Sequence, residues 1–145
     1  MIDFRSTASE HAIQAAFIEW CHIMSKIDNR FEYIFGVPNA AKRSQYIARK
    51  MLEEGLSAGV PDVLCLFPTS HYPGFAIEFK SAGKSPTKQQ ARWLGRLHAA
   101  GWKVGVLYSV EEAVAFTTAY FAVGEKRLRV PTERKIPDNH GGTTG

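Results

Sequence analysis

The chain has 145 residues, of which 45% are hydrophobic and 22% are charged. A chain of this length usually folds as one domain with its own core, and this composition excludes a disordered chain, a collagen-like repeat and a disulfide-stabilised miniprotein. No segment reaches the roughly 18 apolar residues of a membrane-spanning helix, and the first residues lack the basic-then-apolar order of a signal peptide. We therefore expect a cytoplasmic protein with no membrane partner.

The net charge of +4 is distributed unevenly along the chain. Residues 1–83 contain 8 Lys or Arg and 9 Asp or Glu, whereas residues 84–145 contain 10 and 5. No acidic residue lies between Phe79 and Val110. Such a basic region favours a polyanionic partner, of which nucleic acid is the commonest. A solvated basic face that only keeps the protein soluble is the alternative.

Hydrophobic periodicity and turn residues predict a small mixed α/β domain. The turn segment PTSHYPG predicts a hairpin of the strands on either side of it, and the strand, helix and strand that follow predict a crossover unit. Residues 122–145 are basic, contain Pro and Gly, and are predicted to be a flexible tail. In chain order the predicted elements are a helix over 8–27, a strand over 31–38, a helix over 41–54, strands over 62–67 and 75–80, a helix over 86–100, a strand over 103–108 and a helix over 110–121.

Capping residues predict where these helices begin and end. Thr7 and Glu10 have the spacing of a capping box before the first helix. Ser85, followed by a proline, suits the start of the 86–100 helix. Gly55 and Gly101 suit the left-handed turns that end the second and third helices.

Three ionisable residues are predicted to meet at one edge of the sheet. Glu78 and Lys80 are two residues apart on one predicted strand, so their side chains leave the same face. Asp62 opens the preceding strand, and in an antiparallel hairpin the start of the first strand lies beside the end of the second. Asp62, Glu78 and Lys80 are therefore expected to lie close together. A partly buried ion pair at a strand end is the purely structural alternative.

These three residue types suit metal-dependent phosphodiester chemistry. Two neighbouring carboxylates repel each other unless positive charge lies between them, and Mg²⁺ binds one or two carboxylates while it keeps several waters. Such an ion polarises a phosphodiester and activates a water molecule. The lysine would position that water and balance developing negative charge.

Two helical residues are expected at the same edge. Gln90 falls at the centre of the apolar, sheet-facing stripe of the 86–100 helix, and a buried amide needs polar partners. Glu10 lies at the margin of the buried face of the first predicted helix. Its alternative role is to cap that helix.

These residues, in this order, resemble the VRR-NUC family of PD-(D/E)xK nucleases. The signature is Pro61-Asp62 followed by Glu78-Phe79-Lys80, and the segments VPNAAKR, EGLSAGVPD, IEFKSAGKSPTKQQ and GWKVGVL fit the family pattern around it. The resemblance covers residues 8–115. It assigns residues 1–121 to one VRR-NUC-like nuclease domain and leaves 122–145 as the basic flexible tail.

The resemblance implies a restriction-endonuclease-like core, in which helices flank a mixed central β-sheet. It also implies an endodeoxyribonuclease that depends on Mg²⁺ or Mn²⁺. The implied catalytic residues are Glu10, Asp62, Glu78, Lys80 and Gln90. The implied metal ligands are Asp62, Glu78, the backbone carbonyl of Phe79, and Glu10, the last directly or through water.

The resemblance further implies a stand-alone member that is similar to Holliday-junction resolvases. Such an enzyme is structure-selective and acts on branched DNA as a homodimer, whose two sites cut two strands related by two-fold symmetry. A catalytically inactive nucleic-acid-binding protein of nuclease fold is the alternative. The residues available for a dimer interface, unless one core buries them all, are Phe31, Tyr33, Phe35, Tyr120 and Phe121. The expected DNA-binding residues are Asn39, Arg43, Lys84, Lys88, Arg127 and Arg129.

Overall fold

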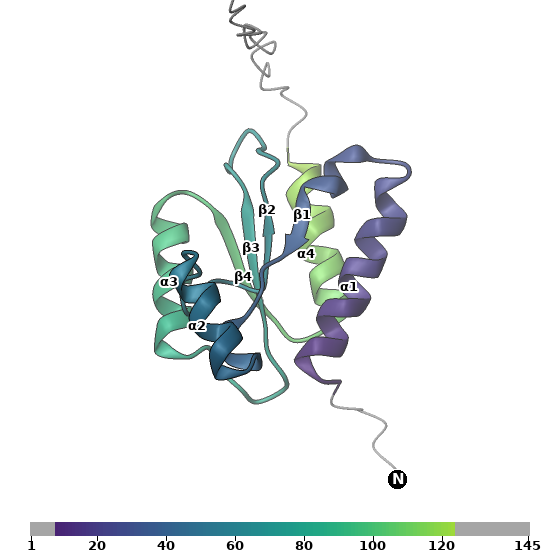
Figure 1. Cartoon of the computed structure of the whole chain (residues 1–145). Helices are drawn as coiled ribbons and strands as arrows, with labels where there is room; N and C mark the ends of the chain where they lie inside the picture. The colour runs from purple at the N-terminus through teal and green to yellow at the C-terminus, as the bar shows by residue number, and fades with distance from the viewer. Residues whose placement is uncertain (1–7, 124–145) are drawn as a thin grey trace, which may run out of the picture.

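The computed structural model describes residues 8–123 and contains one four-stranded sheet with helices on both of its faces (Figure 1). This architecture confirms the predicted mixed α/β fold with a central sheet flanked by helices. In chain order the elements are α1 (Glu10–Ser25), the 3-10 turn η1 (Asn29–Tyr33), β1 (Ile34–Gly36), the 3-10 turn η2 (Ala40–Lys42), α2 (Gln45–Glu53), β2 (Val63–Cys65), β3 (Phe75–Phe79), α3 (Lys88–Ala99), β4 (Lys103–Leu107) and α4 (Val110–Ala122).

The strand order is β1-β2-β3-β4. The β1–β2 and β2–β3 pairs are antiparallel, and Val63 pairs with Ile77 in the second of these. The β3–β4 pair is parallel, and α3 is the crossover helix between these two strands. Both the predicted hairpin and the predicted crossover are therefore confirmed. Because Val63 pairs with Ile77, the residue before Val63 lies beside the end of β3.

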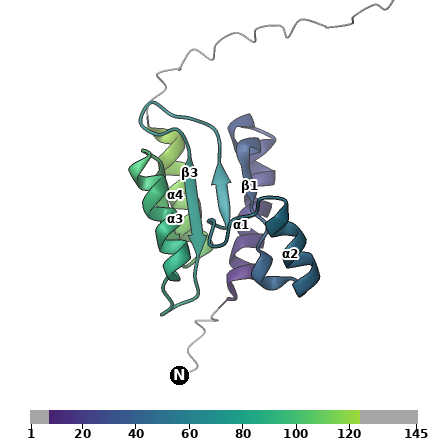
Figure 2. The ribbon, with the colours of Figure 1, turned by 60° about the vertical axis from the view of Figure 1, so that its left-hand side comes forward.

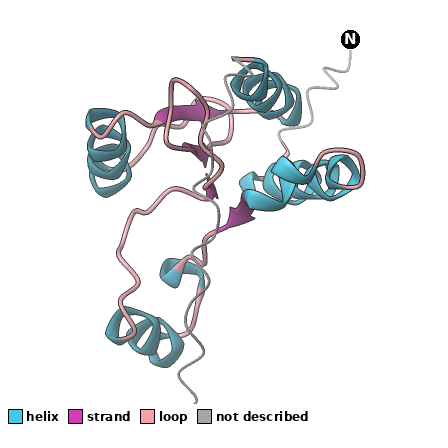
Figure 3. Cartoon of the chain, turned by 90° about the horizontal axis from the view of Figure 1, so that it is seen from above, coloured by secondary structure: helices cyan, strands magenta, loops and turns pink. Residues whose placement is uncertain are grey.

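Helices α1 and α4 pack on one face of the sheet, and α3 packs on the other (Figure 3). All five residues of β3 are buried, because helices cover both of its faces. Its apolar alternation places Phe75, Ile77 and Phe79 in the core, where Phe79 lies against Phe17 of α1. The opposite face of the same strand carries Glu78, and Lys80 directly follows the strand.

Residues 37–61, which connect β1 to β2, form a separate arm that contains η2 and α2. Helix α2 stands off the sheet beyond β1 (Figure 2), and none of its residues is buried. Its side chains Tyr46, Ile47 and Leu52 are all exposed. The backbone N–H of Val37 donates to the carbonyl of Asp62, 2.8 Å away, so the two ends of the arm meet beside Asp62.

Two helices begin later than their capping residues predict. The N-cap of α1 is Ser9, and Thr7 lies outside the described residues. The N-cap of α3 is Thr87 rather than Ser85, because Thr87 forms a reciprocal capping box with Gln90. The predicted glycine ends are confirmed at Gly55 and Gly101, whose φ angles are +101° and +88°.

The structure divides the aromatic residues proposed for an interface into two groups. Phe31, Tyr120 and Phe121 belong to the core, so the core alternative holds for these three. Tyr33 and Phe35 are 47% and 41% exposed. Of the predicted tail, Ala122 is the last residue of α4, so this helix runs one residue beyond the predicted boundary. Residues 124–145 lie outside the described part of the chain.

The two cysteines are free, buried thiols. Burial raises the pKa of Cys21 to about 12 and that of Cys65 to about 11. Both therefore stay protonated and chemically inert near neutral pH. Within residues 8–123, no helix is long and apolar enough to cross a membrane.

Candidate active site

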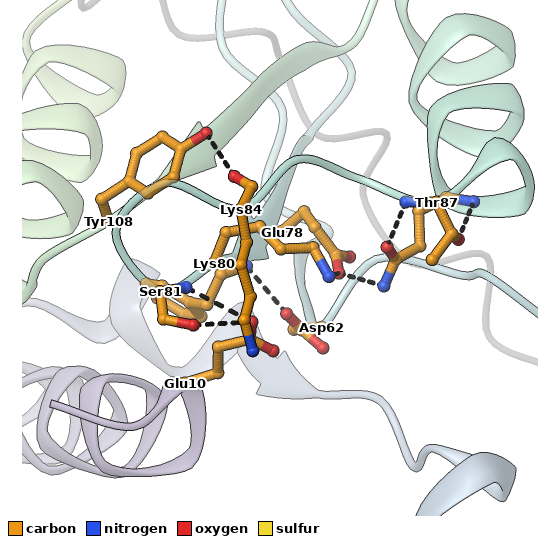
Figure 4. A network of polar contacts seen from close by, with 10 residues as sticks. Glu10, Asp62, Glu78, Lys80, Ser81, Lys84, Thr87 and Tyr108 are labelled. Atoms are coloured by element: carbon orange, nitrogen blue, oxygen red, sulfur yellow. Dashed lines mark hydrogen bonds and ion pairs between the residues drawn. The ribbon is translucent and has the colours of Figure 1, made fainter. Parts of the chain in front are cut away.

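Asp62, Glu78 and Lys80 meet where β3 ends (Figure 4). Asp62 immediately precedes β2, and its Oδ2 accepts a hydrogen bond of 2.8 Å from the backbone N–H of Phe79. This bond holds the Asp62 carboxylate beside the end of β3. The expected convergence of the three side chains is therefore present, and it follows from the hairpin register.

The Glu78 carboxylate is almost fully buried, with a relative exposure of 1%. Its Oε1 accepts a hydrogen bond from Nε2 of Gln90 and lies 3.6 Å from Nζ of Lys80. Its Oε2 is buried and has no hydrogen-bond partner. Burial, followed by the charge of Asp62, raises the pKa of Glu78 to about 8, and Lys80 opposes this rise only in part.

A buried carboxylate oxygen without a partner is costly, because the group has lost its hydration and gained nothing in return. The neighbouring Asp62 adds repulsion, and one lysine does not offset both effects. A hard divalent cation binds carboxylate oxygens and would supply the missing positive charge. The Asp62–Glu78 pair thus fits such an ion, with Oε2 of Glu78 as the oxygen left open for it.

Lys80 brings a positive charge next to Glu78. It is only 8% exposed, and its backbone N–H donates to the carbonyl of Leu107 in β4. The ladder between β3 and β4 therefore holds its main chain, and the ion pair with Glu78 places its ammonium group. A buried lysine beside two carboxylates can donate hydrogen bonds to a water molecule or a phosphate oxygen.

Gln90 reaches the site from the first turn of α3. Its Nε2 donates to Glu78, while its Oε1 accepts from the backbone N–H of Thr87, 2.8 Å away. The apolar stripe of α3 indicated that Gln90 would face the sheet, and the structure places it there. Thr87 was not predicted as a residue of this site, although the order Thr-Lys-Gln-Gln has the spacing of a capping box.

Glu10 has a different neighbour from the one expected. Its Oε1 accepts hydrogen bonds from the backbone N–H and the Oγ of Ser81, at 3.3 Å and 3.4 Å. Glu10 therefore ties α1 to the residue that follows Lys80. In residues 8–123, no group of three His, Cys, Asp or Glu side chains is arranged to hold one metal ion. The charge of Glu10 nevertheless adds to the rise in the pKa of Glu78, and its role as a metal ligand, directly or through water, stays a prediction.

The neighbouring residue Gln14 was also not assigned a role from the sequence. Its Nε2 donates to the backbone carbonyl of Asp62 at 3.5 Å. Ser81 contacts Glu10, and Gln14 contacts Asp62, so each hydrogen bond joins two segments that are far apart in the chain. A serine directly after the Glu-Phe-Lys strand was the only sequence signal for the first contact, and no local pattern indicated the second.

Three of the residues expected to contact DNA, Arg43, Lys84 and Lys88, are exposed. Asn39 is exposed as well, but its Oδ1 caps η2 by accepting from the N–H of Ala41, 2.9 Å away. Arg127 and Arg129 lie outside the described residues.

Comparison with known proteins identifies the family. A family model described as the VRR-NUC domain matches residues 3–111. This chain belongs to the VRR-NUC family. It is thus a member of a family of nuclease domains, and its recognition from the Asp62 and Glu78-Phe79-Lys80 motif is confirmed.

A solved structure titled "VRR_NUC domain protein" has the same fold as this VRR-NUC domain. Its TM-score is 0.66 at 23% sequence identity, over 82% of this chain and 93% of that chain. A comparison with curated proteins found no match.

The buried charge of Glu78 predicts how the stability of this VRR-NUC domain depends on pH in the absence of divalent metal. The pKa of Glu78 rises from 4.5 to about 8 on folding, so between these values the folded state binds more protons than the unfolded state. The free energy of unfolding should therefore fall as pH rises through this range, by at most about 1.4 kcal/mol per pH unit.

Glu78→Gln should remove this slope and raise the melting temperature at pH 8. Thermal unfolding in EDTA at several pH values measures the effect. Glu111→Gln, at an exposed carboxylate on α4, is the matched control and should keep the wild-type slope. A Glu78→Gln protein with the same slope as the wild type would contradict this interpretation of the site.

Proposed function

We propose that this chain is a divalent-metal-dependent endonuclease that hydrolyses phosphodiester bonds of DNA. One observation supports the proposal above the others. Glu78 keeps a buried, unpartnered carboxylate oxygen beside Asp62, while Gln90 and Lys80 occupy only its second oxygen. In a purely structural ion pair, both oxygens of a buried carboxylate are normally hydrogen-bonded.

Asp62 and Glu78 would hold Mg²⁺ or Mn²⁺, together with the backbone carbonyl of Phe79. When bound, the ion supplies charge stabilisation at the phosphate and a water of lowered pKa. The Lys80 ammonium group would hold the attacking water and donate to a phosphate oxygen as negative charge develops. Glu10 would act indirectly, because its bonds to Ser81 fix the chain directly after Lys80.

The surface around the site supports DNA as the substrate. The arm leaves and rejoins the sheet beside Asp62, and residues 39–52 contain four Lys or Arg and no acidic residue. On the other side, Lys84 and Lys88 lie between the end of β3 and the first turn of α3. Both flanks of the site can thus contact phosphates of a strand that crosses it.

An inactive nucleic-acid-binding protein of the same fold is the second candidate. The Asp62–Glu78 pair argues against it, because two carboxylates beside a phosphate weaken binding unless a cation lies between them. A protein that only binds DNA gains nothing from a buried acid at this position. Cleavage and binding assays on the same variants separate the two functions.

We further propose that the preferred substrate is branched DNA, as for a Holliday-junction resolvase, and that the enzyme is a homodimer. Junction resolution needs two cuts on strands related by two-fold symmetry, and one chain has one site. A closed dimer with two-fold symmetry supplies two sites at a fixed separation. The exposed side chains Tyr33, Phe35 and Leu66, which lie on or directly beside the paired strands β1 and β2, offer an apolar surface for the second copy.

Light scattering at micromolar concentration tests the dimer. We expect twice the mass of one chain, which is 16.1 kDa, and we expect Phe35→Ser to lower it to that of one chain. A wild-type protein that runs at 16.1 kDa would contradict the homodimer and leave an enzyme that makes one cut per encounter.

Single substitutions at the site test the chemistry. Asp62→Ala, Glu78→Ala and Lys80→Ala should each lower the rate of junction cleavage in Mg²⁺ by about 100-fold or more. All three variants should keep the fold. In Asp62→Ala and Glu78→Ala the reason is that each removes one of two carboxylates that repel each other. Glu19→Ala, at an exposed carboxylate of α1, is the matched control and should cut at the wild-type rate. EDTA should abolish cleavage by every protein, and an Asp62→Ala protein with wild-type activity would exclude this site.

The salt dependence of DNA binding tests the proposed contact residues. In the non-cleaving Glu78→Ala background, Arg43→Ala and Lys84→Ala should each weaken binding and lower the slope of log K against log salt by about 0.9. Arg92→Ala, on the exposed face of α3, should leave the slope unchanged. If binding is insensitive to salt, or if Arg92→Ala changes the slope as much as the other two, these assignments are wrong.

A further inference from the structure

The side-chain amide of Gln90 is held at both of its ends. Its Oε1 accepts from the backbone N–H of Thr87 at 2.8 Å, and its Nε2 donates to Oε1 of Glu78. We infer that Thr87 is a positioning residue of the active site: its backbone N–H fixes the Gln90 amide so that the donor end faces Glu78. This inference rests on the proposed function of Asp62 and Glu78 as the catalytic centre.

Thr87 fixes which end of the amide turns toward Glu78, and the Glu78 carboxylate matches that end. A carboxylate oxygen accepts hydrogen bonds, so it pairs with the amide nitrogen and not with the amide oxygen. The backbone N–H of Thr87 can only donate, and it therefore holds the oxygen end of the amide. The nitrogen end is then left to face Glu78, which satisfies its Oε1 and leaves Oε2 open.

The same geometry explains why this capping box contains glutamine. A capping box accepts Glu or Gln at its fourth position equally well, because either side chain offers an oxygen to the N-cap N–H. At position 90, however, the second atom of the side chain faces a carboxylate. Glutamate there would cap α3 but would offer Glu78 a like charge in place of a donor.

Gly59 holds the first turn of α3 against the chain that leads to Asp62. Its φ is +81°, and a Cβ atom at this position would lie 2.6 Å from the carbonyl carbon of Gln89 and 2.8 Å from the backbone nitrogen of Gln90. Only glycine allows the two backbones to approach this closely. Since Gly59 is three residues before Asp62, this contact fixes the cap that carries Gln90 relative to Asp62.

Two substitutions of Thr87 separate positioning from helix capping. Thr87 has a φ of −65°, which is the value of proline, so Thr87→Pro fits the backbone while it removes the N–H. Thr87→Ala removes only the capping hydroxyl and keeps the N–H. We expect Thr87→Ala to lower the melting temperature while kcat and the Mn²⁺ affinity stay within about twofold of the wild type. Thr87→Pro should lower both by about 10-fold or more, the size typical of residues that orient a metal ligand.

Three further variants complete this test. Thr87→Ser keeps both the hydroxyl and the N–H, so its kcat and Mn²⁺ affinity should match those of the wild type. Ser44→Pro is the matched control for metal binding, because Ser44 caps α2 with a φ of −58°, away from Gln90, and its substitution should leave the Mn²⁺ affinity unchanged. Gln90→Glu should keep the cap of α3, because the capping box survives, and should still lower kcat by about 10-fold or more.

A readout in the metal-free protein keeps this test independent of the proposed function. The Gln90 side-chain NH₂ should show slowed hydrogen exchange by NMR in the wild type and in Thr87→Ala, and this protection should be lost in Thr87→Pro. Equal kcat, Mn²⁺ affinity and Gln90 protection in Thr87→Pro and Thr87→Ala would overturn the role of Thr87. A wild-type protein that neither binds Mn²⁺ nor cuts DNA, yet shows this pattern of protection, would refute the proposed function alone.

Discussion

The burial of the Glu78 carboxylate is the interaction on which the rest of the site depends. It stands on a strand with helices on both faces, so solvent does not reach it, and desolvation dominates the rise of its pKa to about 8. The polar neighbours Gln90, Lys80 and Asp62 each change the electrostatic environment of this carboxylate. Gln90 and Lys80 partly satisfy one oxygen, and Asp62 adds a second negative charge. In the proposed function, a divalent cation would reduce the repulsion between these two carboxylates.

An unpartnered buried atom does not by itself identify a site. Among the described residues, Oγ1 of Thr117 is also buried without a partner, on the inner side of α4. Its hydroxyl is neutral, and the loss of a hydrogen bond there carries a modest cost. Glu78 differs because its open oxygen belongs to an ionisable group with a second carboxylate and a buried lysine next to it. The unpartnered oxygen of Glu78 supports the proposed function because charged groups also converge on it.

The sequence predicts that Asp62, Glu78, Lys80 and Gln90 lie close together, because three short-range rules suffice. The two-residue period of a strand places Glu78 and Lys80 on one face, and a hairpin places Asp62 beside them. The helical period then turns Gln90 toward the sheet. Each rule uses residues that are close in the chain or joined by one turn, and each therefore works without knowledge of the tertiary structure.

The supporting contacts could not be predicted in this way. Ser85 and Thr87 are both good N-caps, and the choice between them depends on Gln90, whose side chain completes the capping box at Thr87 and also reaches Glu78. The bond between Glu10 and Ser81 joins residues 71 positions apart, and no periodicity encodes it. The amphipathic sequence of α2 predicts a helix but not where it packs. Amphipathic helices are expected to pack their apolar face on the core, whereas α2 has no buried residue.

The most direct measurement is the position of a metal ion in a crystal soaked with Mn²⁺, found from its anomalous scattering. The account predicts one peak between the Glu78 carboxylate and Asp62, with Oε2 of Glu78 among the ligands, and no peak at this position in Glu78→Gln crystals. A peak only elsewhere on the protein, or an empty Asp62–Glu78 pair at a Mn²⁺ concentration that supports cleavage, would contradict it.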